Sequence, residues 1–231
     1  MLNILKHDFL ITSYCTIKIL LKKIEIKKNI TFGKNIIMKF FEHNEFFIDE
    51  KVQFIKMSNE YKVFNKEGQQ IGMVKQMLSG GQTALRLILN KAMLPFTLNI
   101  NDESGNTLVV IKRGWTWWTS KITILDNTGR MLGIIKQKIR FFKPTFKILN
   151  PQMQEVGVIT GDWKAWNFDI KDNSGKSIGI INKKWAGLAK EMFTTADKYI
   201  VTINPEYTHE MNKIIILSAA ITIDMVLKES K

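Results

Sequence analysis

A short turn pattern recurs along this chain, and it constrains the fold more than any other feature. An Asp or Asn is followed at the third position by Gly, and an aliphatic residue comes shortly afterwards, often with a second Gly. A fifth copy keeps the spacing but has Met where the others have Gly. The copies are Asn65–Gly68, Asp102–Gly105, Asp126–Gly129, Asp172–Gly175 and, without Gly, Asn150–Met153.

Each copy predicts a tight β-hairpin turn. Asp or Asn at the first position can accept hydrogen bonds from the backbone of its own turn. Gly at the fourth position can take the left-handed conformation that follows a type I turn in a bulged hairpin. Because Met153 replaces this Gly, we expect its loop to close differently, with Pro151 fixing φ for a type I turn. The flanking segments KITIL and NFDIK alternate as half-buried strands do.

The repeat predicts a mainly β fold. Its spacing is mostly about 24 residues, which is one hairpin per unit. Consecutive hairpins favour an antiparallel sheet, and about twelve strand candidates lie between Phe46 and Ile203. A propeller is disfavoured because its blades repeat at about 40 residues or more. We therefore expect a closed antiparallel barrel of about twelve strands.

The end of the chain is apolar on every side of a predicted helix at about 206–228, NKIIILSAAITIDMVLKE being its main part. The uncharged run from Ile214 to Ile223 rises only roughly 15 Å, about half of a bilayer core. A longer span would place Asp224 in lipid, although Asp224 and Lys228 are spaced to pair on one helix face. A helix that is apolar all round is usually buried in protein, and a wide barrel needs filling. We expect this helix to fill the barrel, with Ser218 and Thr222 bonded inside; a single-pass membrane anchor is the alternative.

The chain is strongly basic, and its first part differs from the rest. The formal net charge of +13 favours polyanionic partners, either anionic lipid or nucleic acid. Residues 1–37 hold seven lysines against Asp8 and Glu25 and lack the turn pattern. We expect the barrel domain to cover residues 38–231 and residues 1–37 to be a basic extension, either a disordered tail or a start-site artefact.

Catalytic and metal-binding signatures do not stand out in the sequence. Cys15 is the only cysteine, which excludes an internal disulfide and a cysteine-based metal site. The three histidines, His7, His43 and His209, lie far apart and form no ligand-spaced pair. No nucleophile–base set stands out in the sequence, so we expect the protein not to be an enzyme.

Two clusters combine basic and aromatic residues. Tryptophan next to Lys or Arg suits a lipid headgroup interface, but core packing and stacking on nucleic acid are alternatives. Strand alternation would put Trp115 and Trp117 on one face and Trp118 on the other, so at least one face should be buried. The candidate lipid or membrane residues are Lys112, Arg113, Trp115, Trp117 and Trp118 in the first cluster, and Lys183, Lys184 and Trp185 in the second.

Three segments carry a resemblance to a known family. KKWAGLAKEMFTTADKYIV and IIILSAAITIDMVLKE resemble the C-terminal part of phospholipid scramblases, and RGWTWWTSKITILD strengthens the match. The chain is also similar to plant LURP-one-related proteins and their bacterial relatives. The resemblance covers about residues 40–229 and implies the Tubby C-terminal-like fold, a twelve-stranded barrel around a hydrophobic C-terminal helix. The isoleucine- and lysine-rich composition suggests a bacterial-type member.

The resemblance also implies a calcium loop of twelve positions. Transferred to this sequence, the loop runs from Thr195 to Glu206, with Asp197 third, Lys198 fourth and Glu206 twelfth. Calcium requires several oxygen ligands, and anionic ones set its affinity. Two carboxylates with a lysine make a poor site. We therefore expect no cofactor, and Asp197 and Glu206 are the only calcium candidates.

The function implied by the resemblance is scramblase-like. We expect a phospholipid-associated protein that binds anionic membrane lipid, or that moves phospholipid between leaflets, without chemistry. Its location would be cytoplasmic and peripheral to the membrane. Binding is favoured over intrinsic scrambling because a barrel filled by its own helix offers no obvious lipid path. The alternative is a soluble basic module that binds nucleic acid or protein; the oligomeric state is left open.

Overall fold

The computed structural model places two compact units along the chain, Met1–Lys39 and Phe40–Lys231. In the first unit, residues 18–23 are helical and exposed. The predicted boundary at residues 37 and 38 stays a prediction. The structure describes residues 18–23, 37, 39–53, 58–78, 81, 89, 93–116, 119–138, 145–162, 164–183, 198–207 and 210–229.

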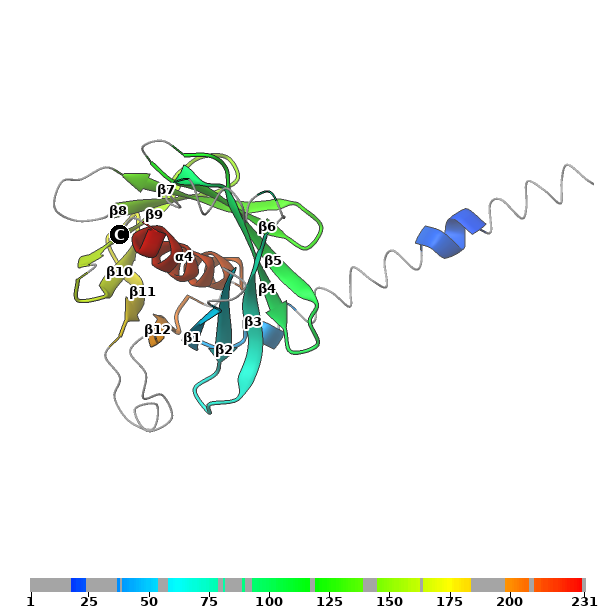
Figure 1. The fold of residues 1–231 in the computed structure, drawn as a ribbon, viewed down its shortest axis with the longest axis horizontal. Coiled ribbons are helices and arrows are strands. Elements are labelled where there is room, and N and C mark those ends of the chain that lie inside the picture. Colours follow the sequence, from blue (N-terminus) through cyan, green and yellow to red (C-terminus); the bar gives the residue numbers. More distant parts are fainter. Residues whose placement is uncertain are drawn as a thin grey trace, which may run out of the picture. The chain divides into compact units, whose positions relative to one another are not determined.

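Twelve antiparallel strands close into a barrel, which confirms the predicted fold class (Figure 1). Consecutive strands are neighbours, and the ring closes where β1 pairs with β12. The strands are β1 (Glu45–Gln53), β2 (Ser58–Phe64), β3 (Gln70–Met77), β4 (Phe96–Asp102), β5 (Thr107–Arg113), β6 (Lys121–Asp126), β7 (Met131–Lys138), β8 (Thr145–Leu149), β9 (Glu155–Asp162), β10 (Asn167–Asp172), β11 (Ser177–Asn182) and β12 (Lys198–Ile203).

The four Asp/Asn-x-x-Gly turns and the Asn150–Met153 turn join five hairpins as predicted. In the turn after β6, the Gly129 amide donates to the Asp126 carbonyl at 3.0 Å, and Gly129 has φ of 86°. Four of the five turns have Gly in this left-handed conformation. The different closure expected at Met153 is wrong: Met153 has φ of 65°, and its amide donates to the Asn150 carbonyl at 2.9 Å. The hairpin geometry therefore prevails over the conformational preference of methionine.

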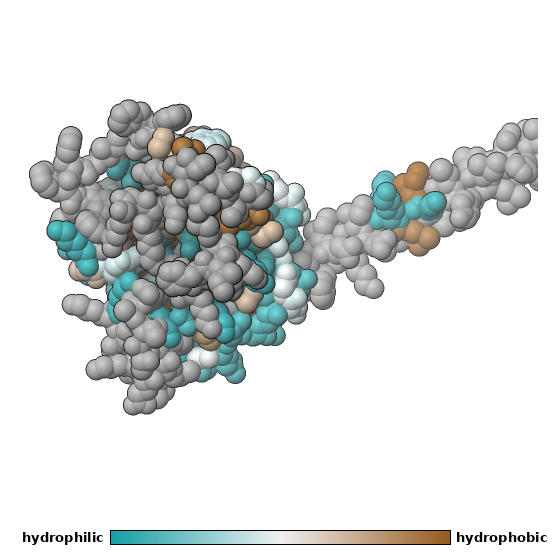
Figure 2. Space-filling view, viewed as in Figure 1, coloured by the Kyte–Doolittle hydropathy of each residue, from teal (hydrophilic) through white to brown (hydrophobic). Residues whose placement is uncertain are grey.

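The barrel interior is apolar because inward and outward residues alternate along the strands. On β6, Ile122 and Ile124 have no exposed surface, whereas Lys121 is exposed. Figure 2 shows hydrophilic and hydrophobic residues interspersed on the coloured outer surface. Gly133, the second Gly of the β6–β7 copy of the repeat, faces the central helix: a Cβ at this position would lie 3.2 Å from the Ile215 side chain. Glycine at this position lets the helix approach the wall closely.

The C-terminal helix α4 (Glu210–Glu229) runs through the barrel, as predicted, and begins four residues after the expected start (Figure 1). Its side chains are buried from Lys213 to Val226. In the described part of the chain, none of the helices has the length and apolarity needed for a membrane span.

The polar side chains of α4 differ from the expectation at two positions. The Ser218 and Thr222 hydroxyls are fully buried and have no hydrogen-bond partner in the described part of the chain, so the predicted bonds inside the barrel are wrong. Asp224 is also fully buried, and the expected partner side chain, Lys228, lies outside the described side chains. The pKa of Tyr199 is raised well above its usual value, mainly by burial and, to a smaller extent, by the negative charge of Asp224.

The two ends of the barrel are built differently. At one end, here called the turn end, the five Asp/Asn turns lie with the first turn of α4, and Lys213 Nζ donates to the Glu42 and His43 carbonyls at 3.1 and 3.3 Å. At the other, the loop end, lie the connections β1–β2, β3–β4, β5–β6, β7–β8, β9–β10 and β11–β12, and all of these except β1–β2 and β9–β10 are longer than the turns. The C-terminal part of α4 points to the loop end, where Met225 Sδ accepts a hydrogen bond from Asn59 of β2.

Candidate functional site

All six tryptophans fall, in sequence, within three of the connections between strands, and the two that the structure describes, Trp115 and Trp166, lie at the loop end. Trp115, Trp117 and Trp118 lie between β5 and β6, Trp163 and Trp166 between β9 and β10, and Trp185 between β11 and β12. The five turns at the opposite end contain no tryptophan and include acidic residues such as Glu67, Glu103 and Asp172. The topology therefore brings Lys112 and Trp115 of the first predicted cluster and Lys183 of the second to the same end of the barrel.

The first cluster has an exposed part, formed by Lys112 and Trp115. Lys112 is exposed near the end of β5, and Trp115 is 57% exposed. Because β5 ends at Arg113, strand alternation does not apply at Trp115. The next residue is anchored, since the Thr116 amide donates to the Met93 carbonyl at 3.2 Å and its hydroxyl donates to the Thr119 carbonyl at 2.6 Å. Trp117 and Trp118 lie outside the described residues.

Arg113, by contrast, is an interior residue. It is only 3% exposed, and its guanidinium donates to the Leu94 carbonyl from Nε at 3.2 Å and from Nη2 at 2.6 Å. The guanidinium carbon also lies 4.4 Å from the centre of the Phe96 ring. Arg113 thus fastens the β3–β4 connection to the barrel, and its side chain is not at the surface with Lys112.

The second cluster rests on a buried aromatic stack. Lys183 is half-buried, and its Nζ lies 4.8 Å from the centre of the Trp166 ring, a cation–π contact. Trp166 in turn stacks on Tyr199 at 5.4 Å and meets Phe168 edge-on at 5.9 Å. Lys183 is therefore held at the loop end, while Lys184 and Trp185 lie outside the described residues.

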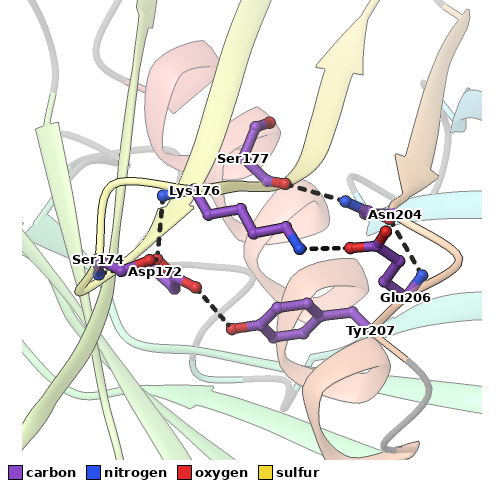
Figure 3. A network of polar contacts seen from close by, with 7 residues as sticks. All are labelled: Asp172, Ser174, Lys176, Ser177, Asn204, Glu206 and Tyr207. Carbon is purple, nitrogen blue, oxygen red and sulfur yellow. Dashed lines mark hydrogen bonds and ion pairs between the residues drawn. The ribbon is translucent and has the colours of Figure 1, made fainter.

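Glu206, one of the two calcium candidates, belongs to a polar network at the turn end (Figure 3). The network joins the β10–β11 turn to the connection between β12 and α4: Lys176 forms an ion pair with Glu206, and the Tyr207 hydroxyl donates to Asp172 Oδ2 at 3.1 Å. The hydrogen bond from Lys176 lowers the pKa of Glu206. Hydrogen bonds from the Ser174 hydroxyl and from backbone amides likewise lower the pKa of Asp172.

This network uses Glu206 in a structural contact. Asp197, the other calcium candidate, lies outside the described residues. Among the residues that the structure describes, no three His, Cys, Asp or Glu side chains come together as metal ligands. The arrangement around Glu206 thus supplies a lysine where a divalent cation would need further oxygen ligands.

Sequence analysis missed one further feature, a row of lysines on the outer wall. Lys121 of β6 lies directly opposite Lys136 of β7, and Lys136 lies directly opposite Lys147 of β8. Alternation along each strand predicts that these side chains point outward, but it does not identify their partners across the sheet. The pairing depends on register, which shifts at a bulge between Ile124 and Leu125.

Comparison with known proteins gives a consistent family match. The family model described as Scramblase matches residues 29–230. Human phospholipid scramblase family member 5 is 27% identical over 157 residues, 62% of this chain and 56% of that protein. Mouse phospholipid scramblase 1 is 24% identical over 201 residues, 81% of this chain and 60% of that protein. The chain therefore spans less than two thirds of the length of these relatives.

A solved structure has a similar fold. The X-ray structure of a protein from Arabidopsis thaliana aligns with a TM-score of 0.50 over 84% of this chain and 96% of that one. Only 8% of the aligned residues are identical, so this similarity concerns the fold alone.

Proposed function

The chain belongs to the Scramblase family, and we propose that it is a peripheral phospholipid-associated protein whose loop end contacts an anionic membrane surface. The relatives carry the name phospholipid scramblase, which supports phospholipid as the partner. The proposal involves no chemical reaction. It places the protein on the cytoplasmic face of the membrane, where anionic lipids attract basic segments.

The observation that carries the proposal is the exposed Trp115 beside the exposed Lys112 at the loop end. Tryptophan is enriched at membrane–water interfaces because its ring is amphipathic, and lysine is attracted to anionic headgroups. Lys183 and the Trp166 ring that it contacts lie at the same end. The turn end, with its acidic turn residues, lacks this combination.

Membrane binding is favoured over movement of lipid through the barrel. Helix α4 occupies the interior, and its residues from Lys213 to Val226 are buried. A phospholipid therefore has no passage along the barrel axis unless the helix moves. Any role in moving phospholipid between leaflets would then depend on the outer surface and the loop end. We also propose that binding needs no calcium, because Glu206 is paired with Lys176.

The test compares two exposed apolar residues at opposite ends of the barrel. Trp115→Ala removes a side chain that is 57% exposed at the loop end, and Met153→Ala removes one that is 52% exposed at the turn end. We expect Trp115→Ala to weaken binding to vesicles of phosphatidylcholine and phosphatidylserine by about tenfold, since an interfacial Trp loses its burial in the membrane. Met153→Ala should bind as the wild type does.

Two results would contradict the proposal. Equal binding by Trp115→Ala and the wild type would remove the loop end as the contact surface. Failure of the wild type to bind anionic vesicles at low salt, together with a salt-dependent shift of random DNA, would point to a nucleic-acid partner instead.

A further inference from the structure

A strip of lysines crosses four neighbouring strands on the outer wall, close to the loop end. The register places Lys121, Lys136 and Lys147 side by side on β6, β7 and β8. On β5, Lys112 lies opposite Thr123, which puts it diagonally beside Lys121. The residues next to them in sequence, Ile111, Ile122, Ile135 and Phe146, are fully buried inside the barrel, so the lysines face outward.

The strip differs from several lysines elsewhere on the barrel, which pair with acidic residues. Lys198 Nζ lies 3.4 Å from Asp49, and Lys171 Nζ lies 3.4 Å from Asp169. At the turn end, Lys66 pairs with Glu67 and Lys176 with Glu206.

Within the strip, only Lys147 has such a partner, Glu155. In the described part of the chain, Lys112, Lys121 and Lys136 form no ion pair. Three of the four lysines of the strip thus differ from the paired lysines above.

Like charges directly opposite each other in a sheet destabilise it. Lys121 and Lys136 are in this position, and both are exposed. Neighbouring strands lie about 4.8 Å apart, so the backbones of Lys121, Lys136 and Lys147 span a width of about 10 Å. A phosphate placed above these lysines would offset the repulsion between them, so the strip is suited to bind anions. Lysine binds phosphate as a mobile point charge and adapts to several headgroup positions.

We propose that the strip of Lys112, Lys121, Lys136 and Lys147 binds the phosphate groups of anionic phospholipids at the bilayer surface. The inference rests on the proposed membrane function and adds the chemistry and orientation of the contact. Trp115 follows Lys112 by three residues in sequence, and its exposed ring lies at the same loop end to which the strip is close. The barrel would thus meet the membrane at its loop end, tilted toward the wall formed by β5–β8. Trp115 favours a lipid surface over other polyanions as the partner.

The experiment compares two double variants that lose the same charge. Lys121→Gln/Lys136→Gln removes two lysines of the strip, and Lys66→Gln/Lys176→Gln removes two acid-paired lysines at the turn end. Binding is measured at low salt on vesicles of phosphatidylcholine with a minority of phosphatidylserine, and on phosphatidylcholine alone. We expect the strip variant to bind the anionic vesicles about 30-fold more weakly and the control to change by less than about threefold. Thermal unfolding should show that the strip variant is at least as stable as the wild type.

The outcomes separate this inference from the proposed function. Equal weakening by both double variants would mean that net charge alone governs binding, and it would overturn the strip while keeping the membrane function. Full binding by the strip variant would have the same consequence. A wild-type protein that ignores anionic vesicles would refute the membrane function itself. If that protein shifts DNA and the strip variant does not, the strip binds nucleic acid and the lipid assignment is wrong.

Discussion

Replacing Lys121 stepwise with Gln and then Glu has opposite expected effects on stability and on membrane binding. Lys121→Gln removes the repulsion from Lys136 on the neighbouring strand, and Lys121→Glu turns it into attraction. A cross-strand charge pair is worth roughly 0.2–1 kcal/mol, so the complete change should stabilise the fold by about 1 kcal/mol. In a domain of this size, that raises the melting temperature by about 2–4 °C, with Lys121→Gln between the two.

Vesicle binding should change in the other direction. Each basic residue near an anionic surface contributes about 1 kcal/mol to binding, and Lys121→Glu alters the charge by two. Binding to phosphatidylserine-containing vesicles should therefore weaken about 30-fold, with Lys121→Gln losing about fivefold. A residue that is retained for binding at the expense of stability would behave in this way.

The assay is thermal unfolding of the three proteins at low and at high salt, with vesicle co-sedimentation in parallel. Because both side chains are exposed, salt should screen the interaction and bring the three melting temperatures together. The reasoning would be refuted if Lys121→Glu melted below the wild type, or if its gain persisted unchanged at high salt. Either result would mean that Lys121 and Lys136 do not face each other as the register shows.

Three further predictions concern the turns and the calcium candidate. Met153→Gly should be more stable than Met153→Ala by about 0.5–1 kcal/mol in urea unfolding, because Gly adopts the left-handed conformation without strain, although the greater entropy of Gly in the unfolded chain offsets part of this gain. Gly175→Ala should lose a similar amount of stability. Equal stability of the two Met153 variants would contradict the explanation. At Asp126, burial acts to raise the pKa, but hydrogen bonds from Thr128 and Arg130 hold it below 3.8. The ionised Asp126 therefore stabilises the fold above pH 3.8, and this stabilisation is lost as the pH falls through the folded-state pKa. In urea unfolding over a pH series, the stability of Asp126→Asn should fall less steeply toward acid pH than that of the wild type. Calcium should change neither the melting temperature nor vesicle binding, and a calcium-dependent rise that Glu206→Gln abolishes would show that the loop binds the ion.

The barrel and its central helix could be predicted because local patterns determine both. Each Asp/Asn turn marks where one strand ends and the next begins, and a chain of such hairpins has few arrangements other than a closed antiparallel sheet. The helix was predictable because a segment that is apolar on all sides needs burial on all sides, which a wide barrel provides. A wide barrel needs an apolar filling and an all-apolar helix needs burial, so the two predictions support each other.

The features that escaped prediction depend on partners far away in sequence. Arg113 next to a tryptophan suggests a surface cluster, but the Leu94 carbonyl and the Phe96 ring hold it inside. Met153 takes a conformation that its side chain disfavours because the paired strands on both sides fix the turn. The Lys121–Lys136 pairing requires the register, and a shift by one residue would turn every side chain of the strand to the other face.

The location of the helix restricts how this fold can act on a membrane. Eight large apolar side chains of α4 are buried: Ile214, Ile215, Ile216, Leu217, Ile221, Ile223, Met225 and Val226. Exposing them to water would cost roughly 12–24 kcal/mol, which equals or exceeds the roughly 5–15 kcal/mol that usually holds a domain together. Release of the helix into water is thus equivalent to unfolding, and insertion into lipid would carry the buried Asp224 with it.

The intact barrel is therefore the form that meets the membrane, and its outer surface has to supply the contact. Limited proteolysis should leave residues 210–229 equally protected with and without anionic vesicles, while vesicle co-sedimentation reports binding. Cleavage within α4 that appears only when vesicles are added would show that the helix leaves the barrel. In that case the lysine strip would serve at most as the first point of attachment, and lipid movement would have to be sought in the emptied interior.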